Sequence, residues 1–102
     1  MPQELPPGKV LLDVREADEW AAGHAPGALH IPMSELAGRL EELPGDGELY
    51  VVCRAGSRSA RVTQYLNANG WDATNVDGGM LVWASAGRPL VGEIDGAEPE
   101  VV

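Results

Sequence analysis

Two nearly continuous apolar runs dominate the hydrophobic pattern of this chain. Residues 10–14 read VLLDV, interrupted only by Asp13, and residues 49–53 read LYVVC. Continuous runs are typical of strands that are covered on both faces in a parallel sheet, whereas half-exposed strands alternate between apolar and polar side chains. A shorter segment at residues 73–76 predicts a third strand. The pattern therefore favours a central, mostly parallel sheet.

Helical spacing fills the intervals between these strands. Leu36, Leu40 and Leu43 recur four and three residues apart after Ser34, a suitable helix cap. Glycine or proline follows each helical segment, and we expect Gly23 to end the first in a left-handed conformation. The predicted helices cover residues 16–22, 34–43, 57–69 and 80–86, ending at Gly23, at Pro44 and Gly45, at Gly70, and at Gly87. Residues 24–32 are expected to form an ordered loop, because they contain two prolines.

Strands and helices thus alternate along the chain. This order predicts an α/β domain with helices on both faces of the sheet, because right-handed crossovers connect neighbouring parallel strands. A length of 102 residues suits one domain. We assign residues 1–91 to this domain and residues 92–102 to an acidic, flexible C-terminal tail. Ligands of such sheets bind beyond the carboxyl ends of the strands, which is where Cys53 falls.

Charge restricts the partners of the chain. It carries 16 acidic and 7 basic residues, a net charge of −9, which argues against nucleic acid and anionic membrane surfaces. Arg54, Arg58 and Arg61 nevertheless lie close together in a stretch, residues 49–68, that contains no acid. A basic spot on an acidic body predicts a small anionic ligand.

Cys53 is the only cysteine, so an internal disulfide is impossible. With two histidines the sequence has no zinc-binding spacing, and a lone thiol suits a reducing compartment. The first nine residues include Glu4 and three prolines, and Asp13 halts the first apolar run, so we expect neither a secretory signal nor a membrane span. We therefore expect a cytoplasmic protein, with no metal and no cofactor implied.

One short segment combines the features of a reactive site. It consists of Cys53, Arg54, Ala55, Gly56, Ser57, Arg58 and Ser59. A strand delivers the thiol to a tight loop in which Gly56 permits backbone angles closed to other residues, and the next helix begins with unpaired amide N–H groups. These amides can face one anion, and together with Arg58 they would lower the pKa of the thiol below the ~8.5 of free cysteine. Cys53 is therefore a candidate nucleophile.

The arginines of this segment break a local rule. Arginine at a helix start opposes the helix dipole, at a cost of ~0.3–1 kcal/mol for each residue. Such violations mark functional sites, and a bound anion would reverse the sign of the interaction. The plain structural alternative is a buried, inert thiol at the end of a strand, a common fate of free cysteine. The glycine loop, the helix start and the arginines favour the functional interpretation.

The segment CRAGSRS resembles the active-site loop of the rhodanese family of sulfurtransferases. Residues 13–16 resemble the family's DVR motif, residues 24–32 resemble its GHIPGA...NIP segment, and residues 78–83 resemble its GGxxxW ending. These motifs follow the family's order over about residues 10–90. The resemblance implies a rhodanese-like three-layer α/β fold with a central, mostly parallel sheet and helices on both faces.

The resemblance also implies a reaction. Cys53 would take a sulfane sulfur from a donor such as thiosulfate, hold it as a persulfide and pass it to cyanide or a thiol. The amides of residues 54–59 would stabilise the thiolate and then the outer sulfur. Arg58 would bind the donor and stabilise charge, and Arg54 would help at the rim. The expected partners are a small anionic sulfur donor and a thiol or protein acceptor.

Three other functions share parts of this pattern. A Cys-loop phosphatase or arsenate reductase also holds an oxyanion over a thiolate, but its motif resembles Cys-x5-Arg, whereas Cys53 and Arg58 enclose four residues. In a mercaptopyruvate-specific enzyme the corresponding loop resembles CGSGVT, and the charged segment CRAGSR departs from it. A non-catalytic rhodanese-like sulfur carrier or regulatory module is the remaining alternative, and such members often lack the cysteine. Retention of Cys53, Gly56 and Arg58 favours catalysis.

The other motif residues have simpler interpretations. Asp13 and Arg15 at the end of a strand are expected to satisfy loop amides or each other. His24 and His30 are expected to form hydrogen bonds within their loop rather than to transfer protons. The three tryptophans are expected to pack in or near the core. Whether Arg61 contributes to the site is left open.

Overall fold

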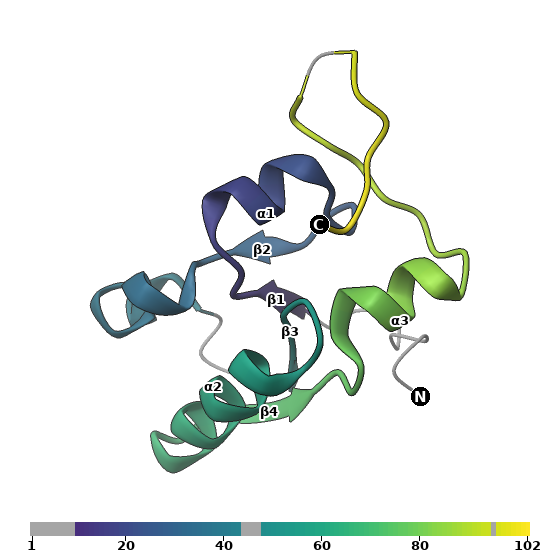
Figure 1. The fold of residues 1–102 in the computed structure, drawn as a ribbon. Helices are drawn as coiled ribbons and strands as arrows, with labels where there is room; N and C mark the ends of the chain where they lie inside the picture. The colour runs from purple at the N-terminus through teal and green to yellow at the C-terminus, as the bar shows by residue number, and fades with distance from the viewer. Residues whose placement is uncertain (1–9, 44–47, 95) are drawn as a thin grey trace.

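The computed structural model describes residues 10–43, 48–94 and 96–102, in which four strands form one parallel sheet in the order β2-β1-β3-β4 (Figure 1). The strands are β1 (Val10–Asp13), β2 (Leu29–His30), β3 (Glu48–Val52) and β4 (Asp72–Asn75). The two apolar runs form the central strands β1 and β3, where Leu12 pairs with Val51. The α/β prediction is confirmed.

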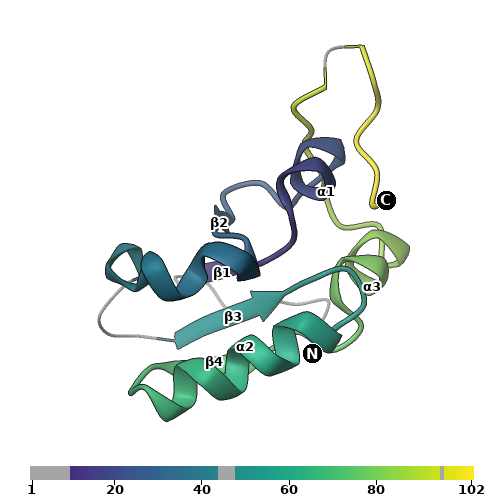
Figure 2. The same cartoon turned by 60° about the vertical axis from the view of Figure 1, so that its left-hand side comes forward.

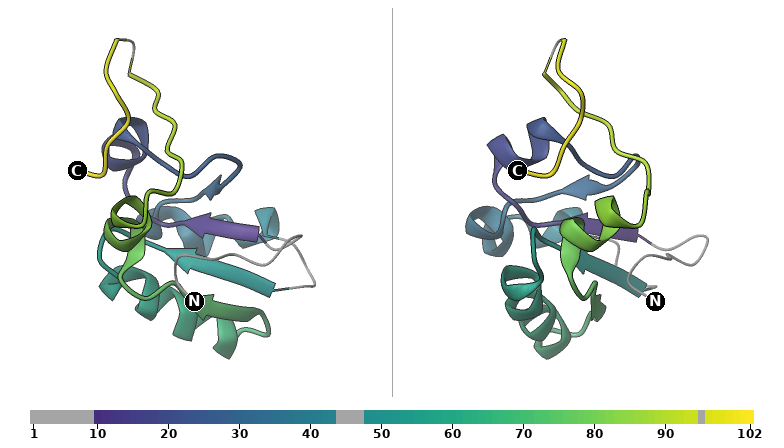
Figure 3. Two further views of the ribbon diagram at one scale, coloured as in Figure 1. Left: turned by 90° about the vertical axis from the view of Figure 1, so that its right-hand side faces the viewer. Right: turned by 45° about the vertical axis from the view of Figure 1, so that its right-hand side comes forward.

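Helices cover both faces of this sheet. They are α1 (Ala17–Ala22), α2 (Ser57–Ala68) and α3 (Gly79–Ser85), together with two 3₁₀ segments, η1 (Met33–Gly38) and η2 (Leu40–Glu42). η1 and α2 lie on one face and α3 on the other (Figures 2 and 3). The three-layer arrangement predicted from the family resemblance is therefore present.

Alternate residues of the central strands build the two cores. Leu12 and Val51 point to the face on which Val62 and Leu66 of α2 pack. Their neighbours Leu11 and Val52 point to the opposite face, against Met80 and Trp83 of α3. Because successive side chains of a strand face opposite sides, a strand between two helical layers must be apolar throughout.

The helix predicted for residues 34–43 is instead the pair of 3₁₀ segments η1 and η2. Directly after Gly38, Arg39 leaves the helical conformation with φ −129°, so the α-helical hydrogen-bond ladder cannot continue. Ser34 lies inside η1 and does not cap it. The predicted stop at Pro44 and Gly45 falls outside the described residues.

The loop after α1 also differs from expectation. Residues 29–30 form the short edge strand β2, which is too brief to show a hydrophobic period. Gly23 is extended, with φ 174°, and not left-handed. Glycine is needed there for space, because a Cβ at this position would lie 2.4 Å from the carbonyl oxygen of Glu100.

The C-terminal segment returns to the end of α1, and the C-terminus lies beside it (Figure 1). The amides of Glu93 and Glu100 donate to the carbonyls of Ala21 and Ala22, over 2.8 and 2.9 Å. These bonds satisfy acceptors in the last turn of α1, which a helix cannot pair by itself. The boundary at residue 91 and the flexibility of the tail stay predictions. Within the described ranges, no helix is long and apolar enough to cross a membrane.

Candidate active site

Cys53 directly follows β3, at the carboxyl end of the sheet, and its sulfur faces a ring of donors. The Gly56 and Ser59 amides lie 3.1 and 3.4 Å from Sγ, and the Ser59 hydroxyl lies 3.3 Å away. The residue is only 1% exposed, and residues 53–59, called the cup below, provide these donors around its sulfur. An inert core thiol would face apolar groups, whereas this sulfur faces N–H and O–H groups suited to an anion.

These donors lower the pKa of the Cys53 thiol. Burial raises the pKa of Cys53, but hydrogen bonds from the Ser59 hydroxyl and from the amides of Ser59, Gly56 and Ala55 outweigh it. The pKa of Cys53 therefore lies below its usual value, because each of these bonds favours the charged form. The thiolate nucleophile expected from the sequence is supported by this geometry.

Gly56 and α3 hold the cup in shape. Gly56 precedes α2 with φ 111°, a left-handed conformation that favours glycine. Beneath the cup, the amides of Met80 and Leu81 donate to the carbonyls of Cys53 and Arg54, over 2.8 and 3.0 Å. A Cβ on Gly79 would lie 2.4 Å from the Cys53 carbonyl oxygen, so the close approach requires glycine. The carbonyls of Cys53 and Arg54 are thus occupied by α3, while the amides of Gly56 and Ser59 bond to the sulfur.

Arg58 is paired with an acid from a distant element. Its Nη1 and Nη2 donate to Oε1 and Oε2 of Glu19 in α1, over 2.7 and 2.9 Å. The hydrogen bond to Arg58 is the main reason why the pKa of Glu19 lies below its usual value. No acid lies near this arginine in the sequence, because Glu19 precedes it by 39 residues. Glu19 is therefore a site residue that local sequence reasoning missed.

Two other polar residues of the loop, Arg54 and Ser57, are exposed. Arg54 is exposed, and its Nε donates to the backbone carbonyl of Val102 over 2.9 Å. Ser57 is exposed at the first position of α2. The structure thus brings Gly56 and Ser59 to Cys53, whereas Arg54 and Arg58 contact the tail and α1.

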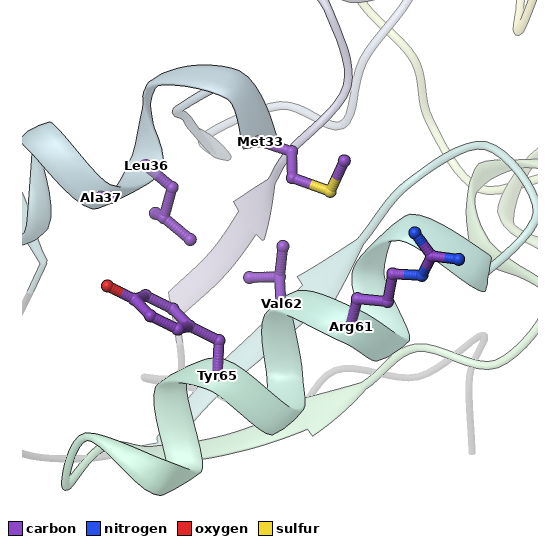
Figure 4. A pocket seen from close by; sticks show the side chains of 6 residues that line it. All are labelled: Met33, Leu36, Ala37, Arg61, Val62 and Tyr65. Atoms are coloured by element: carbon purple, nitrogen blue, oxygen red, sulfur yellow. The ribbon is translucent and has the colours of Figure 1, made fainter.

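Arg61 belongs to a different feature, a pocket of about 220 Å³ between η1 and α2. Figure 4 shows Arg61 and Met33 at one end of this pocket and Tyr65 at the other. The lining residues are Met33, Leu36, Ala37, Arg61, Val62 and Tyr65. Arg61 therefore lies beside an apolar surface.

Comparison with known proteins decides the family. A family model described as "Rhodanese-like domain" matches residues 3–86. The chain belongs to the rhodanese family. It is 42% identical over 79 residues to YtwF of Bacillus subtilis, covering 78% of this chain and 77% of that protein. It is 37% identical over 83 residues to an Allochromatium vinosum protein named "Sulfurtransferase", covering 80% of this chain and 78% of that protein.

The fold comparison agrees with this assignment. The crystal structure of a rhodanese-related protein from Thermoplasma volcanium matches with a TM-score of 0.78 and 35% identity. The match covers 81% of this chain and 83% of that one. Family membership and a relative named as a sulfurtransferase together support a sulfurtransferase.

A second site residue of this rhodanese domain comes from β4. The Ser59 hydroxyl also contacts the amide oxygen of Asn75, and Asn75 Nδ2 lies 3.4 Å from the Gly56 carbonyl. Asn75 thus holds both residues that donate to the sulfur. Its position at the carboxyl end of the strand beside β3 is a signal that could have identified it.

The DVR motif of the family is structural here. Arg15 and Asp13 are buried and form a bidentate pair, with Arg15 Nη2 2.7 Å from Asp13 Oδ2. Arg15 Nη2 also donates to the carbonyl of Gly23, and Nη1 lies 3.4 Å from the carbonyl of Glu19. The expected structural role is confirmed, and the motif ties α1 to the end of β1.

The histidines of the second motif stack on a tryptophan. The rings of His24 and His30 lie 3.5 and 4.5 Å from the ring of Trp20, nearly parallel to it. His24 Nδ1 donates to the Trp20 carbonyl, and His30 Nε2 donates to the Arg15 carbonyl, each over 2.8 Å. Both histidines form structural hydrogen bonds, as expected, but the acceptors belong to α1 and to the segment after β1 rather than to the loop of residues 24–32. In the described part of the chain, no group of three or more His, Cys, Asp and Glu side chains could hold a metal ion.

Proposed function

We propose that this chain is a sulfurtransferase that moves a sulfane sulfur from thiosulfate to a nucleophilic acceptor through a persulfide on Cys53. One observation carries the proposal. The sulfur of Cys53 accepts hydrogen bonds from the amides of Gly56 and Ser59 and from the hydroxyl of Ser59, at the start of α2. This arrangement stabilises negative charge on one sulfur atom.

In the first half-reaction, the Cys53 thiolate attacks the outer sulfur of thiosulfate. A new bond forms between Sγ and that sulfur, the S–S bond of thiosulfate breaks, and its electron pair leaves with sulfite. The lowered pKa of Cys53 increases the fraction of thiolate available for this attack. The cup amides then stabilise the anionic outer sulfur of the persulfide.

In the second half-reaction, cyanide or a thiolate attacks the outer sulfur. The persulfide bond breaks and its electron pair returns to Cys53, which leaves as a thiolate. A thiol of low pKa is a good leaving group, so the donors that activate Cys53 also favour its release. Both half-reactions therefore use the same hydrogen bonds.

Intact mass measurement after incubation with thiosulfate tests the proposal. We expect one added sulfur atom, removed by a reducing thiol, and no addition to the Cys53→Ser variant. Thiocyanate formation from thiosulfate and cyanide should continue over many cycles in the wild type and vanish in the variant, whose circular dichroism spectrum should be unchanged. A wild-type protein that gains no sulfur would contradict the proposal, and one that loads sulfur without turnover would be a carrier.

A further inference from the structure

Arg58, whose charge interacts with Cys53, is already paired with an acid. Arg58 and Glu19 form a bidentate contact, with N–O distances of 2.7 and 2.9 Å. Their side chains are 30% and 16% exposed, so the pair lies at the surface of the cup rather than in the core. An anionic donor that reaches Cys53 therefore meets an arginine whose charge an acid has balanced.

Local structure fixes Glu19 in this position. Its Oε1 accepts the backbone amide of Glu16 over 3.0 Å, as part of a capping box at the start of α1. Its backbone carbonyl lies 3.4 Å from Nη1 of the buried Arg15. Glu19 is thus held at its side chain and at its backbone, which distinguishes it from a pair of mobile surface side chains.

A second acid adds to the negative charge at this place. Glu16 is exposed, and its carboxylate also interacts with Arg58. Hydrogen bonding to Glu19, with charges on Glu19, Cys53 and Glu16, raises the pKa of Arg58 above its usual value. Two carboxylates therefore act on one guanidinium. A donor with two negative charges is repelled more strongly here than a donor with one.

We propose that Glu19 determines the donor charge that this site prefers, and that it favours sulfane donors with one negative charge over dianionic thiosulfate. The inference rests on the proposed function and deepens it. Glu19 acts through Arg58, so it is a specificity-determining and positioning residue and not one that takes part in bond changes. Thiosulfate stays a donor, used less efficiently than a monoanion of the same shape.

A matched pair of donors tests this inference. Methanethiosulfonate resembles thiosulfate in shape but carries a methyl group in place of one charged oxygen. Attack by Cys53 on its outer sulfur forms the same persulfide, and the electron pair of the broken S–S bond leaves with methanesulfinate. We expect the wild type to show a higher kcat/KM for this monoanion, measured at low ionic strength with cyanide as acceptor.

Glu19→Gln should shift the preference toward thiosulfate. Removing one charge near the reactants should raise the ratio of kcat/KM for thiosulfate to that for methanethiosulfonate about three- to tenfold, and added salt should reduce this gain. Most of the change should appear in KM, because Arg58 becomes available to the dianion. Glu42→Gln is the matched control, because Glu42 is exposed, pairs with Arg39 and should leave the ratio unchanged.

A double variant shows whether the effect passes through Arg58. In an Arg58→Gln background, Glu19→Gln should change the ratio little. If Glu19→Gln lowered kcat/KM equally for both donors, the inference would be overturned and Glu19 would be a purely structural residue. Such a result would not affect the proposed function. Failure of both donors to load sulfur onto the wild-type protein would contradict the proposed function and this inference together.

Discussion

Two ion pairs hold α1, and they differ mainly in their contact with water. Asp13 and Arg15 are 1% and 0% exposed, whereas Glu19 and Arg58 are 16% and 30% exposed. Both pairs are bidentate and have a shortest N–O distance of 2.7 Å. The first pair joins α1 to β1, and the second joins α1 to the start of α2. The same chemistry therefore serves the fold in one place and borders the candidate active site in the other.

Burial explains the different uses of the two pairs. Breaking a buried pair leaves an uncompensated charge, which is strongly unfavourable, so Arg15 cannot exchange Asp13 for another partner. Water can solvate both members of a partly exposed pair, so its opening costs little. Arg58 can therefore turn from Glu19 to a passing anion. An arginine beside a reactive thiol needs this freedom, and an arginine that anchors a helix does not.

The largest expected effect belongs to the buried pair. Asp13→Asn leaves the Arg15 guanidinium buried without its charge partner, and should lower the free energy of unfolding by about 3–5 kcal/mol. Urea denaturation measures the loss. Asp72→Asn, an exposed position at the start of β4, is the matched control and should leave the midpoint nearly unchanged. A loss below about 1 kcal/mol for Asp13→Asn would remove the contrast between the two pairs.

A smaller loss of stability, with a change in chemistry, is expected at Ser59. Ser59→Ala removes a buried hydroxyl that contacts Cys53 and Asn75, and should lower the free energy of unfolding by about 1 kcal/mol. The same change removes a bond that favours the thiolate, so the pKa of Cys53 should rise. Ser59→Ala therefore changes the site without touching either ion pair.

The pH dependence of cysteine alkylation measures this shift. In the wild type, the rate should reach half its maximum below the pH found for free cysteine, because the folded pKa is lowered. In Ser59→Ala the midpoint should move upward, so alkylation slows at neutral pH and recovers in alkaline solution. Ser85→Ala at the end of α3 is the control. An unmoved midpoint would show that the backbone amides alone lower the pKa.

The smallest effect on stability is expected for the partly exposed pair. Glu19→Gln should lower the free energy of unfolding by less than about 1 kcal/mol, because solvent screens both charges. The stabilisation should be present above the usual carboxyl pKa and lost as the pH falls through the lowered pKa of Glu19. Denaturation at neutral and acidic pH measures both. A loss as large as that of Asp13→Asn would show that the Glu19 pair is structural.

Much of the fold could be predicted from the chain because its signals are local. The apolar runs at residues 10–14 and 49–53 became β1 and β3, and Gly56 took the left-handed conformation expected before α2. The 3₁₀ segments of residues 33–42 and the two-residue strand β2 escaped prediction. Leucine spacing does not distinguish short helix types, and a strand of two residues shows no period.

The sequence by itself determined the cup, because its parts are neighbours in the chain. Cys53, Gly56 and Ser59 lie within one strand-loop-helix unit, and steric limits on its backbone bring their donors to one sulfur. Only the tertiary structure decided which groups surround the cup. Glu19 pairs with Arg58, Asn75 contacts Ser59, and the C-terminal segment forms backbone hydrogen bonds with α1. These contacts join residues far apart in the chain, so they exist only after packing of the sheet and its helices has brought those residues together.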